Sequence, residues 1–515
     1  RNEENMEHIF TVINDFFKFI VPISDFLWDF PTNFSFYSSI PILGKFSFAI
    51  ILLIGSGIYF TIRTKFVQIT RFREGLRILI KKKSSKMGVS PLASFLLSSA
   101  TRVGPGNIMG VTGAISIGGP GAVFWMWVSA FFGMATAFSE SVLAQIFKEE
   151  DGNDYIGGLP FYGRKILGDK RVAGIILSVC FIFYALFTLP GQTFHLFTAL
   201  GSVAEVIGGQ EYGRQSNVYY IIAVGIFISV LFTVLGGIKR VTKVTDVLVP
   251  IMAVIYMLIV LFIIAVNFRL VPYFFKEVIM GAFSPKAVFG GAFGIALAQG
   301  IKRGLMSNEA GQGTITMAAA VADNEHPCEQ GFVQAIGVFL DTIVICTLTG
   351  FVVVMAHLWN NGSSGVEWEV IRGSKLTVYL NSIQYLIPGE SLDAIVKCIV
   401  SLCYGLFAFT TLIGLILFTE ISGSFITTNK KFILFIRLLG AVIFVPFGEL
   451  TVLSGLELGN LWYISDLINI MIVFANVPVI LIGSNIVFKA LDHYNVNKGR
   501  RFISKEIGIE TEVWK

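Results

Sequence analysis

The chain has 515 residues, of which 54% are hydrophobic and only 14% are charged. Soluble globular proteins carry about 25% charged residues, so this composition excludes that class. Apolar runs of roughly 20 residues, the length of a membrane-spanning helix, recur from Phe46 to Ile486 and predict an all-α integral protein of the cell membrane. The formal net charge of +5 does not indicate nucleic acid binding, because in such a protein the distribution of charge reports topology.

The N-terminal residues 1–40 contain no predicted span. Their apolar stretch, 9–30, is interrupted by Asp15, Lys18 and two further aspartates, which is typical of an interfacial amphipathic helix and argues against a signal peptide. The first predicted span is 46–62. A dense basic cluster follows it, and the positive-inside rule places this cluster in the cytoplasm and the N-terminus outside. The cluster comprises Lys65, Arg71, Arg73, Arg77, Lys81, Lys82, Lys83 and Lys86.

A broken span is predicted at 91–117. Its middle reads Gly104-Pro105-Gly106-Asn107, and a helix cannot run through it because proline lacks an amide hydrogen and glycine costs backbone entropy. Unpaired backbone groups are tolerated at membrane depth only where they are buried in protein or line a cavity. Transporters bind substrates and ions at such breaks. The alternatives are a simple kink and a GxxxG-type helix contact.

Nine further spans follow, which brings the expected number to about eleven and places the C-terminus in the cytoplasm. Most Lys and Arg residues then fall in loops on the predicted cytoplasmic side, as the positive-inside rule requires. A glycine-rich span begins near Ala287, after an amphipathic outer segment at 272–283. The other spans are 120–147, 172–202, 217–237, 244–267, 331–356, 388–419, 432–448 and 460–488.

Residues 289–313 form a second interrupted segment, rich in glycine and polar groups. Five spans separate its start from that of the break at 91–117, so the two segments hold equivalent places in successive five-helix units, and an odd number of spans inverts the second unit. A 5+5 inverted repeat is therefore predicted, with the site between two discontinuous helices. The predicted segments are 1–40 (interfacial helix and outer segment), 41–90 (extra span and basic cytoplasmic amphipathic segment), 91–267 (first repeat), 268–488 (second repeat) and 489–515 (basic cytoplasmic tail).

Ionisable side chains within the spans are functional candidates, because such groups are expensive inside a membrane. Glu140 and Asp341 interrupt apolar helices. They either take part in coupling or are structural, paired with Arg102, with Lys302 and Arg303, or with backbone amides. The other polar groups that interrupt spans are Gln192, Thr410, Thr411 and Asp466.

Thr410 and Thr411 are the better candidates for ion ligands. Two adjacent hydroxyls can add oxygens to the carbonyls of an unwound helix, and hard cations such as Na⁺ prefer oxygen ligands. The alternative is that each hydroxyl bonds to the carbonyl four residues earlier in its own helix.

Three stretches resemble the alanine or glycine:cation symporter family, the sodium:alanine symporters of the amino acid–polyamine–cation superfamily. They are 118–133 (GGPGAVFWMWVSAFFG), 302–311 (KRGLMSNEAG) and 337–342 (GVFLDT). The likeness runs from about Ile54 to Glu420, in order and at family spacing. It implies a ten-helix leucine-transporter-type core preceded by one extra span. It also implies symport of a small neutral amino acid with Na⁺, or sometimes H⁺, by alternating access.

The resemblance implies that Asn107 and the backbone of Gly104 and Gly106 hold the substrate, and that Gln192 and the region of Thr411 complete the pocket. Half-helix ends suit a zwitterion, because free amides can face its carboxylate and free carbonyls its ammonium group. The expected substrate-binding residues are Thr101, Gly104, Gly106, Asn107, Gln192, Gln299, Gly300, Thr411 and Leu415. The expected ion-binding residues are Val103, Thr410 and Thr411, and the coupling or structural charges are Arg102, Glu140, Glu309 and Asp341.

Two positions depart from the family pattern. Pro105 stands where threonine is expected, which removes one hydroxyl near the site. Leu415 stands where some members place tryptophan, which would open the pocket beyond alanine and glycine, toward glutamine or other neutral amino acids.

Proton coupling is the alternative within transport, with Glu140, Asp341 or His195 as the carrier. An integral-membrane enzyme has less support, because the five histidines are scattered without nucleophile–base or metal-ligand spacing. A channel would need a selectivity-filter-like repeat, and the sequence has none. The expected partners are the amino acid, Na⁺ or H⁺ and the lipid bilayer. No cofactor, no metal other than Na⁺ and no nucleic acid is expected, and the expected state is a monomer.

Overall fold

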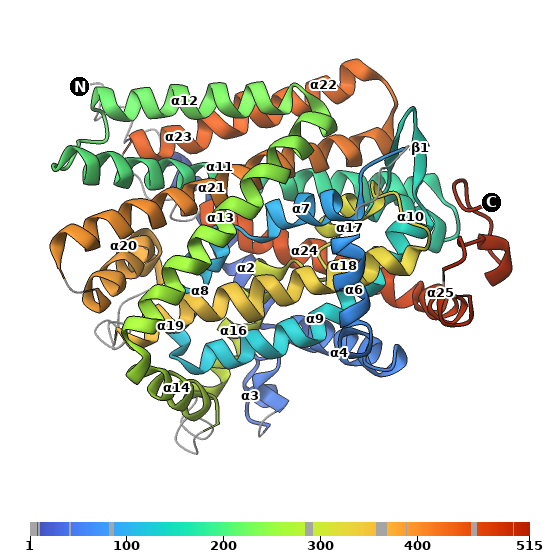
Figure 1. The fold of residues 1–515 in the computed structure, drawn as a ribbon, viewed down its shortest axis with the longest axis horizontal. Coiled ribbons are helices and arrows are strands. Elements are labelled where there is room, and N and C mark those ends of the chain that lie inside the picture. Colours follow the sequence, from blue (N-terminus) through green and yellow to red (C-terminus); the bar gives the residue numbers. More distant parts are fainter. Residues whose placement is uncertain are drawn as a thin grey trace.

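The computed structural model describes residues 8, 11–40, 43–81, 87–283, 292–356, 368–387, 389–454, 461–497 and 499–515. In these residues the long helices run side by side along one axis of the molecule (Figure 1). The start of the predicted glycine-rich span near Ala287 and part of the basic cluster, Lys82, Lys83 and Lys86, lie outside the described residues.

The helices follow the predicted spans closely, and both predicted interruptions are present. The elements up to the first interruption are η1 Phe17–Phe19, α2 Ile20–Asp29, α3 Ser35–Ser38, η2 Leu43–Lys45, α4 Phe48–Arg63, α5 Val67–Thr70, α6 Phe72–Ile80, α7 Pro91–Arg102, η3 Pro105–Asn107 and α8 Met109–Gly118. The next are α9 Gly121–Ile146, β1 Glu149–Asp151, β2 Asp154–Ile156, α10 Leu159–Ile166, α11 Arg171–Gly208, α12 Asn217–Val234, α13 Gly237–Val266, η4 Phe268–Leu270 and α14 Val271–Phe283. The last are α16 Ala292–Asn308, α17 Thr314–Ala320, α18 Pro327–Val338, η5 Phe339–Cys346, α19 Thr347–Met355, α20 Trp368–Leu386, α21 Glu390–Ile426, α22 Lys430–Leu438, η7 Leu439–Phe444, α23 Val445–Leu453, α24 Leu461–Ile482, α25 Ser484–Val496 and η8 Ser504–Ile507.

Eight helical segments among the described residues are long and apolar enough to cross a membrane. They are α9, α11, α12, α13, the continuous run α18–η5–α19, α21, the run α22–η7–α23, and α24. Helix α12 shows the lipid-facing pattern, because Ile221, Val224, Ile228 and Phe232 are exposed at intervals of three or four residues. Such an apolar stripe is unfavourable in water and suits hydrocarbon. The chain is a multi-pass membrane protein.

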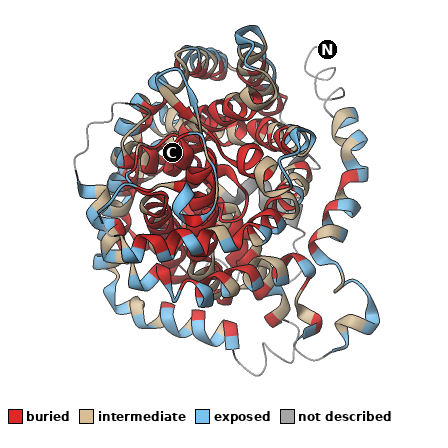
Figure 2. Ribbon diagram, turned by 90° about the vertical axis from the view of Figure 1, so that its right-hand side faces the viewer, coloured by how far each residue is buried: buried red, intermediate tan, exposed pale blue. Residues whose placement is uncertain are grey.

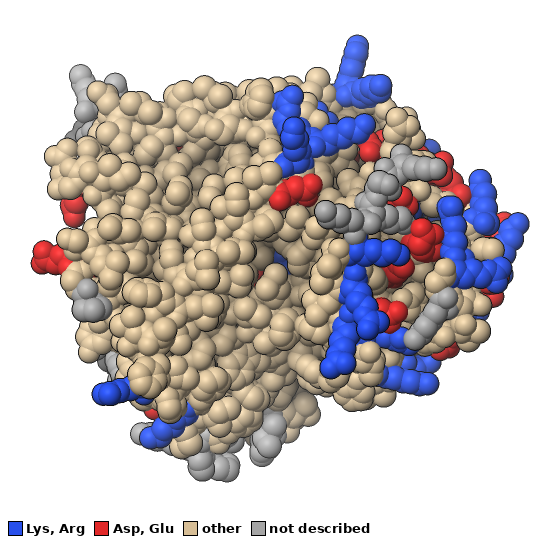
Figure 3. Space-filling view, viewed as in Figure 1, with Lys and Arg blue, Asp and Glu red and all other residues tan. Residues whose placement is uncertain are grey.

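Charged side chains gather at one end of the bundle, near β1, α22 and α25, while most of the face in view is uncharged (Figure 3). This basic end includes the exposed residues Arg73, Lys239, Lys430, Arg500 and Arg501. A wide uncharged belt beside a charged end is the pattern that a bilayer imposes on a spanning protein.

Two details of this end differ from the sequence-based expectation. The segment 148–171, predicted as a loop, contains the hairpin β1–β2 and helix α10. Its turn is closed by Gly152, whose φ of 64° is the left-handed value that a tight hairpin turn requires. The last predicted span, 460–488, is two helices, because α24 ends at Ile482 and α25 begins at Ser484.

The tail that follows α25 folds back onto the basic end. Trp514 is only 1% exposed, and its Nε1 donates to the carbonyl of Gln145 at the end of α9 at 2.7 Å. The amide of Phe502 donates to the carbonyl of Glu325, just before α18, at 2.9 Å. The tail therefore packs against the ends of helices that are distant in sequence.

A buried histidine pair joins the same elements. The amide of Cys328 donates to Nδ1 of His326 at 3.1 Å, so the ring proton of His326 is on Nε2 and faces Nδ1 of His493 at 3.1 Å. Nε2 of His493 then donates to Glu506 of η8 at 2.7 Å. Burial and the neighbouring His493 lower the pKa of His326 from 6.5 to about 3, so this relay holds a neutral His326.

Three long helices frame the interior. Helix α11 packs along α21, and α9 packs against both α16 and α18, so the interrupted helices are enclosed by continuous ones. Helix α2 lies outside this core and runs along the side of the bundle against α24 (Figure 2). Buried residues fill the centre of the bundle, where the two interruptions meet (Figure 2).

Candidate substrate and ion site

The first interruption separates α7 from α8 by six residues. Helix α7 ends at Arg102, Gly104 is fully extended, and one 3₁₀ turn at 105–107 leads into α8. This is a break and not a simple kink, since no helix passes through 103–108. It leaves carbonyls at the end of α7 and amides at the start of α8 available at the same place.

Asn107 braces this break from inside the protein. Its side chain is completely buried, Oδ1 accepts the amide of Gly104 at 2.8 Å, and Nδ2 donates to Oδ1 of Asp341 at 2.6 Å and to Ser307 at 3.0 Å. The carboxylate of Asp341 also accepts the hydroxyls of Ser307 and Thr342, both at 2.7 Å. These contacts hold the first break against the end of α16 and against the π-helical segment η5.

The second interruption separates α16 from α17 at 309–313. Gly311 and Gly313 have φ values of 88° and 78°, and Glu309 is also left-handed at 58°. Glu140, from α9, holds this linker, because its carboxylate accepts the amides of Gly311 at 3.0 Å and Gly313 at 3.2 Å. It also accepts Nδ2 of Asn476, from α24, at 2.9 Å. Free amides of the linker thus have a buried acceptor.

Glu309 connects the two interruptions. One of its carboxylate oxygens accepts the hydroxyl of Thr101, at the end of α7, at 3.0 Å and that of Thr314, at the start of α17, at 2.9 Å. Because charge-assisted bonds are stronger than neutral ones, this carboxylate ties the half-helices together.

Arg102 is a fully buried cation beside both breaks. Its Nε donates to the carbonyl of Asn308 at 3.2 Å and its Nη2 to Oε1 of Gln334 at 3.1 Å. The guanidinium fills the space that a side chain at position 337 would occupy, because a Cβ built on Gly337 would lie 1.6 Å from Nη1. The sequence alone does not indicate which groups Arg102 contacts. In the structure it bonds to the last residue of α16 and to the middle of α18.

The two breaks meet at a cavity of about 70 Å³. At about 10–15 Å³ for each water-sized group, it has room for about five to seven such groups, which is close to the size of alanine. The lining residues come from the two breaks and from three continuous helices. They are Thr101, Arg102, Gly104, Pro105, Gly106, Met109, Gly110, Tyr184, Thr188, Gly191, Gln192, His195, Arg303, Met306, Glu309, Thr411, Leu415, Ser465 and Asn469.

Most of the predicted substrate residues therefore lie together. Thr101, Gly104, Gly106, Gln192, Thr411 and Leu415 all line the cavity, as do the charges Arg102 and Glu309. Sequence reasoning missed the rest of the α11 wall, Tyr184 and Thr188. Both lie on the helical face of Gln192, at steps of four residues, so helical periodicity was the signal that would have found them.

Three predicted substrate residues are not part of the cavity lining. Asn107 braces the first break, as described above. Gly300 packs against α9, since a Cβ there would lie 2.5 Å from both the carbonyl oxygen of Ala122 and Cβ of Trp125, and Gln299 adjoins Gly118. Glu140 and Asp341 hold the two breaks and do not line the cavity.

The two threonines of α21 differ in orientation. The hydroxyl of Thr411 lies 3.2 Å from the carbonyl oxygen of Ala100, on α7, and 2.8 Å from that of Phe407. The hydroxyl of Thr410 bonds to Phe407 at 3.1 Å and faces the sulfur of Met252. The bond from Thr411 to Phe407 is the bond to the carbonyl four residues earlier in the same helix, which is the alternative to ion binding given above. Thr411 also contacts Ala100 at the end of α7, whereas Thr410 faces α13.

A sequence model of the sodium:alanine symporter family matches residues 36–506. The chain belongs to this family. Three similar relatives are each 34% identical to this sodium:alanine symporter family member. The amino-acid carrier protein AlsT of Bacillus subtilis (strain 168) aligns over 94% of this chain and 93% of its own length. The probable sodium/glutamine symporter GlnT of the same organism covers 87% and 88%, and the sodium/alanine symporter AgcS of Methanococcus maripaludis covers 87% and 94%. This family member is a transporter and not an enzyme.

The fold of this symporter-family chain is similar to that of a solved transporter of low sequence identity. A manganese transporter of Eremococcus coleocola, solved with an aromatic bis-isothiourea substituted compound, has a TM-score of 0.50 and 10% identity, over 83% of this chain and 94% of that chain. Similarity at this level of identity concerns the fold and not the substrate.

Proposed function

We propose that this chain is a sodium-coupled symporter of a small neutral amino acid that works by alternating access. The observation that carries the proposal is the cavity of about 70 Å³ at the meeting point of two interrupted helices. Membrane transporters place substrate where half-helix ends supply unpaired backbone groups, since those groups replace water around the charges of the substrate.

The proposed substrate site is the cavity wall formed by Thr101, Gly104, Gly106 and Gln192, closed by Leu415. The amide of Gly106 and those at the start of α8 would face the carboxylate, and carbonyls at the end of α7 would face the ammonium group. Asn107, Gln299 and Gly300 would act from behind this wall. The volume favours alanine or glycine. Relatives named as alanine and glutamine symporters support a neutral amino acid of this class.

The proposed Na⁺ ligands are the hydroxyl of Thr411 and the carbonyl oxygens of Ala100, Val103 and Phe407. Three of these four oxygens already lie close together, because Thr411 contacts both carbonyl groups within 3.2 Å. Hydroxyl and carbonyl oxygens suit a hard cation. Thr410 joins this set only if its hydroxyl turns away from Met252.

The proposed topology has eleven spans, with the N-terminus outside and the basic end in the cytoplasm. Besides the eight long segments, α4 and the two interrupted helices would cross the membrane. The interruptions at 103–108 and 309–313 hold equivalent places in a 5+5 inverted repeat, a symmetry that gives two alternating pathways to one site. The proposed functional unit is the monomer.

The test is uptake of radiolabelled alanine, glycine and glutamine into proteoliposomes, with Na⁺ replaced by K⁺ in parallel. Uptake that depends on an inward Na⁺ gradient supports the proposal. Uptake that continues in K⁺ and collapses when the pH gradient is dissipated would establish proton coupling instead. His195 and Glu309, two titratable groups that line the cavity, would then be the carriers to test.

A further inference from the structure

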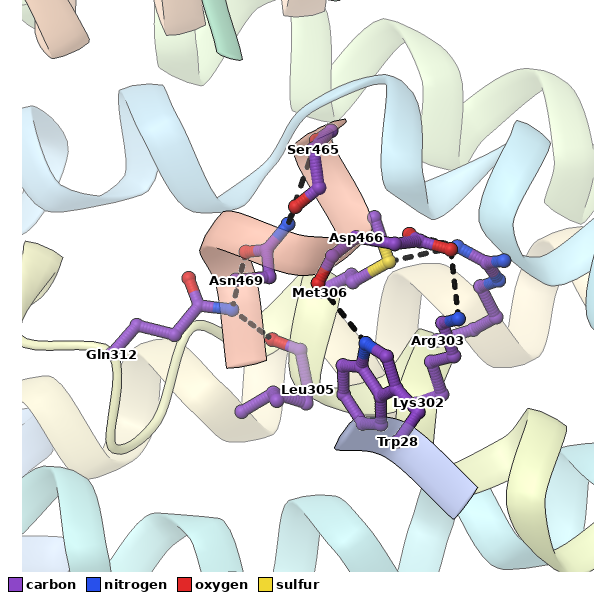
Figure 4. A network of polar contacts seen from close by, with 9 residues as sticks. All are labelled: Trp28, Lys302, Arg303, Leu305, Met306, Gln312, Ser465, Asp466 and Asn469. Atoms are coloured by element: carbon purple, nitrogen blue, oxygen red, sulfur yellow. Dashed lines mark hydrogen bonds and ion pairs between the residues drawn. The ribbon is translucent and has the colours of Figure 1, made fainter. Parts of the chain in front are cut away.

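A buried ion-pair cluster lies on the wall of the cavity (Figure 4). Asp466, in the second turn of α24, is 0% exposed, and its carboxylate contacts Nζ of Lys302 at 2.7 Å and Nη1 of Arg303 at 3.3 Å. Both cations belong to α16, the helix that ends at the second break. A buried carboxylate is strongly destabilised when its cations are withdrawn, so these pairs hold α16 and α24 together.

Trp28 joins this cluster from outside the bundle. It lies at the end of α2, is 5% exposed, and its Nε1 donates to the main-chain carbonyl of Asp466 at 3.0 Å. The ammonium group of Lys302 lies 4.9 Å from the centre of the indole ring, within the range of a cation–π contact. One side chain thus contacts both partners of the ion pair. The family match begins at residue 36, so α2 precedes the part of the chain common to the family.

The cluster forms one side of the cavity. Arg303 lines the cavity and its Nη1 lies 2.8 Å from the sulfur of Met306, another lining residue. On the α24 side, Ser465 and Asn469 line the cavity, and Asn469 accepts a bond from Gln312 of the second break at 3.1 Å. Asp466 is near the start of α24, the end remote from α25 and from the basic end. If α16 and α24 separate at this point, the cavity therefore opens on the side that faces away from the basic end.

We propose that α2 is a clasp, in which Trp28 holds the Asp466–Lys302–Arg303 pairing closed and thereby sets how readily the cavity opens on this side. Trp28 is a positioning residue: it acts through the ion pair and does not touch the cavity. The inference rests on the proposed alternating access, which requires α16 and α24 to separate on one side of the site during each cycle.

The test uses a thiol reporter on the cavity wall. Ser465→Cys is introduced into a chain in which the five native cysteines are replaced, and its rate of modification by a small membrane-impermeant maleimide is measured with the purified protein in vesicles. Ser465 is only partly buried in this structure, so the change in rate between the parent and each variant, and not the rate itself, reports further opening of the wall. Trp28→Phe keeps the aromatic ring and removes the N–H donor, and Trp28→Ala removes both contacts.

We expect the modification rate to rise about 5-fold in Trp28→Phe and about 5- to 30-fold in Trp28→Ala, the range that corresponds to the loss of one or two such contacts. Phe26→Ala is the matched control, because Phe26 is 45% exposed on the same helix and should leave the rate unchanged. Equal rates in Trp28→Phe, Phe26→Ala and the parent would overturn the proposal.

A second measurement separates the clasp from general loosening of the fold. In Asp466→Asn the ion pair that holds Lys302 is already weakened, so adding Trp28→Ala, which removes the ring contact with Lys302, should raise the rate by much less than it does alone. Fully additive effects would overturn a role through the ion pair. The labelling rate can be measured without transport. If the protein without these substitutions shows no Na⁺-driven alanine uptake, the proposed function is refuted, and the labelling rates still test the clasp separately.

Discussion

Replacing Glu140 with glutamine tests whether its carboxylate holds the second helix break. The side chain is 0% exposed and accepts three hydrogen bonds, from the amides of Gly311 and Gly313 and from Asn476. Two of these bonds reach Oε2 and one reaches Oε1. A glutamine in the same position has a single acceptor oxygen, and its amide group turns a donor toward another donor.

The magnitude follows from these three bonds. A hydrogen bond to a charged group contributes about 1.5–3 kcal/mol and a neutral one about 0.5–1.5 kcal/mol. The best glutamine orientation keeps the two bonds on the Oε2 side, weakens each by about 1 kcal/mol, and leaves the amide of Gly311 unpaired at a cost of about 1–3 kcal/mol. The sum, about 3–5 kcal/mol, is an upper value because the variant no longer buries a charge.

The assay is thermal unfolding of the purified protein in detergent, together with Na⁺-driven alanine uptake. Glu140→Gln should lower the apparent Tm clearly and reduce uptake, because the linker 309–313 loses its anchor. Glu205→Gln is the control, since Glu205 is half-buried and bonds only to the hydroxyl of Tyr219 among the contacts described, at 3.1 Å. A Tm and uptake equal to those of the control would refute this reasoning. A normal Tm with lost uptake would assign Glu140 to coupling.

Four further predictions concern the site and the tail. Thr411→Val should raise the Na⁺ concentration for half-maximal uptake and, by thermodynamic reciprocity, weaken alanine affinity at low Na⁺. Thr411→Ser keeps the hydroxyl and should change neither. If Thr411→Val leaves the Na⁺ dependence unchanged, the hydroxyl is not a ligand. Leu415→Trp should fill part of the cavity and reduce alanine uptake about 10- to 200-fold more than glycine uptake, because alanine carries one more methyl group; an equal loss for every amino acid would make 415 a packing position. Asn107→Ala leaves Oδ1 of Asp341 and the amide of Gly104 without the partner described above, so we expect both weaker substrate binding and an apparent Tm lowered by the loss of about 3–5 kcal/mol; a normal Tm would contradict the bracing contacts. Burial lowers the pKa of His326 from its usual 6.5 to about 3, so a state in which the tail is released binds more protons between these values. Docking of the tail should therefore be complete above pH 6.5 and weaken as the pH falls below it, which limited proteolysis of the tail should show. His326→Gln should reduce this pH dependence, and the remainder comes from Glu506, whose pKa the bond to His493 lowers.

The positions of the helices could be predicted from the sequence because they depend on local composition. The Gly-Pro-Gly cluster at 104–106 and the left-handed glycines 311 and 313 end their helices, whereas the single prolines 190, 250 and 478 lie inside continuous helices. The hairpin β1–β2 also had a local signal, the Asp151-Gly152 pair at its turn.

The partners of the buried charges could not be predicted in the same way. Glu140 and Gly311 are 171 positions apart, and Arg102 and Asn308 are 206 apart, so their pairing depends on how the helices pack. The six candidate cavity residues were brought together by the fold, but the sequence did not indicate which of them face the cavity and which, like Asn107, stand behind it. The wall contributed by α24, with Ser465 and Asn469, also comes only from packing.

The contact between Arg102 and Gly337 constrains the order in which these positions can change during evolution. The guanidinium occupies the space of a side chain at 337, so a residue other than glycine there displaces it from its bonds to Asn308 and Gln334. A lineage that first replaces Arg102 with a smaller residue avoids this cost. The reverse order passes through a chain with a displaced buried cation, and we therefore expect the two sites to vary as a pair among descendants.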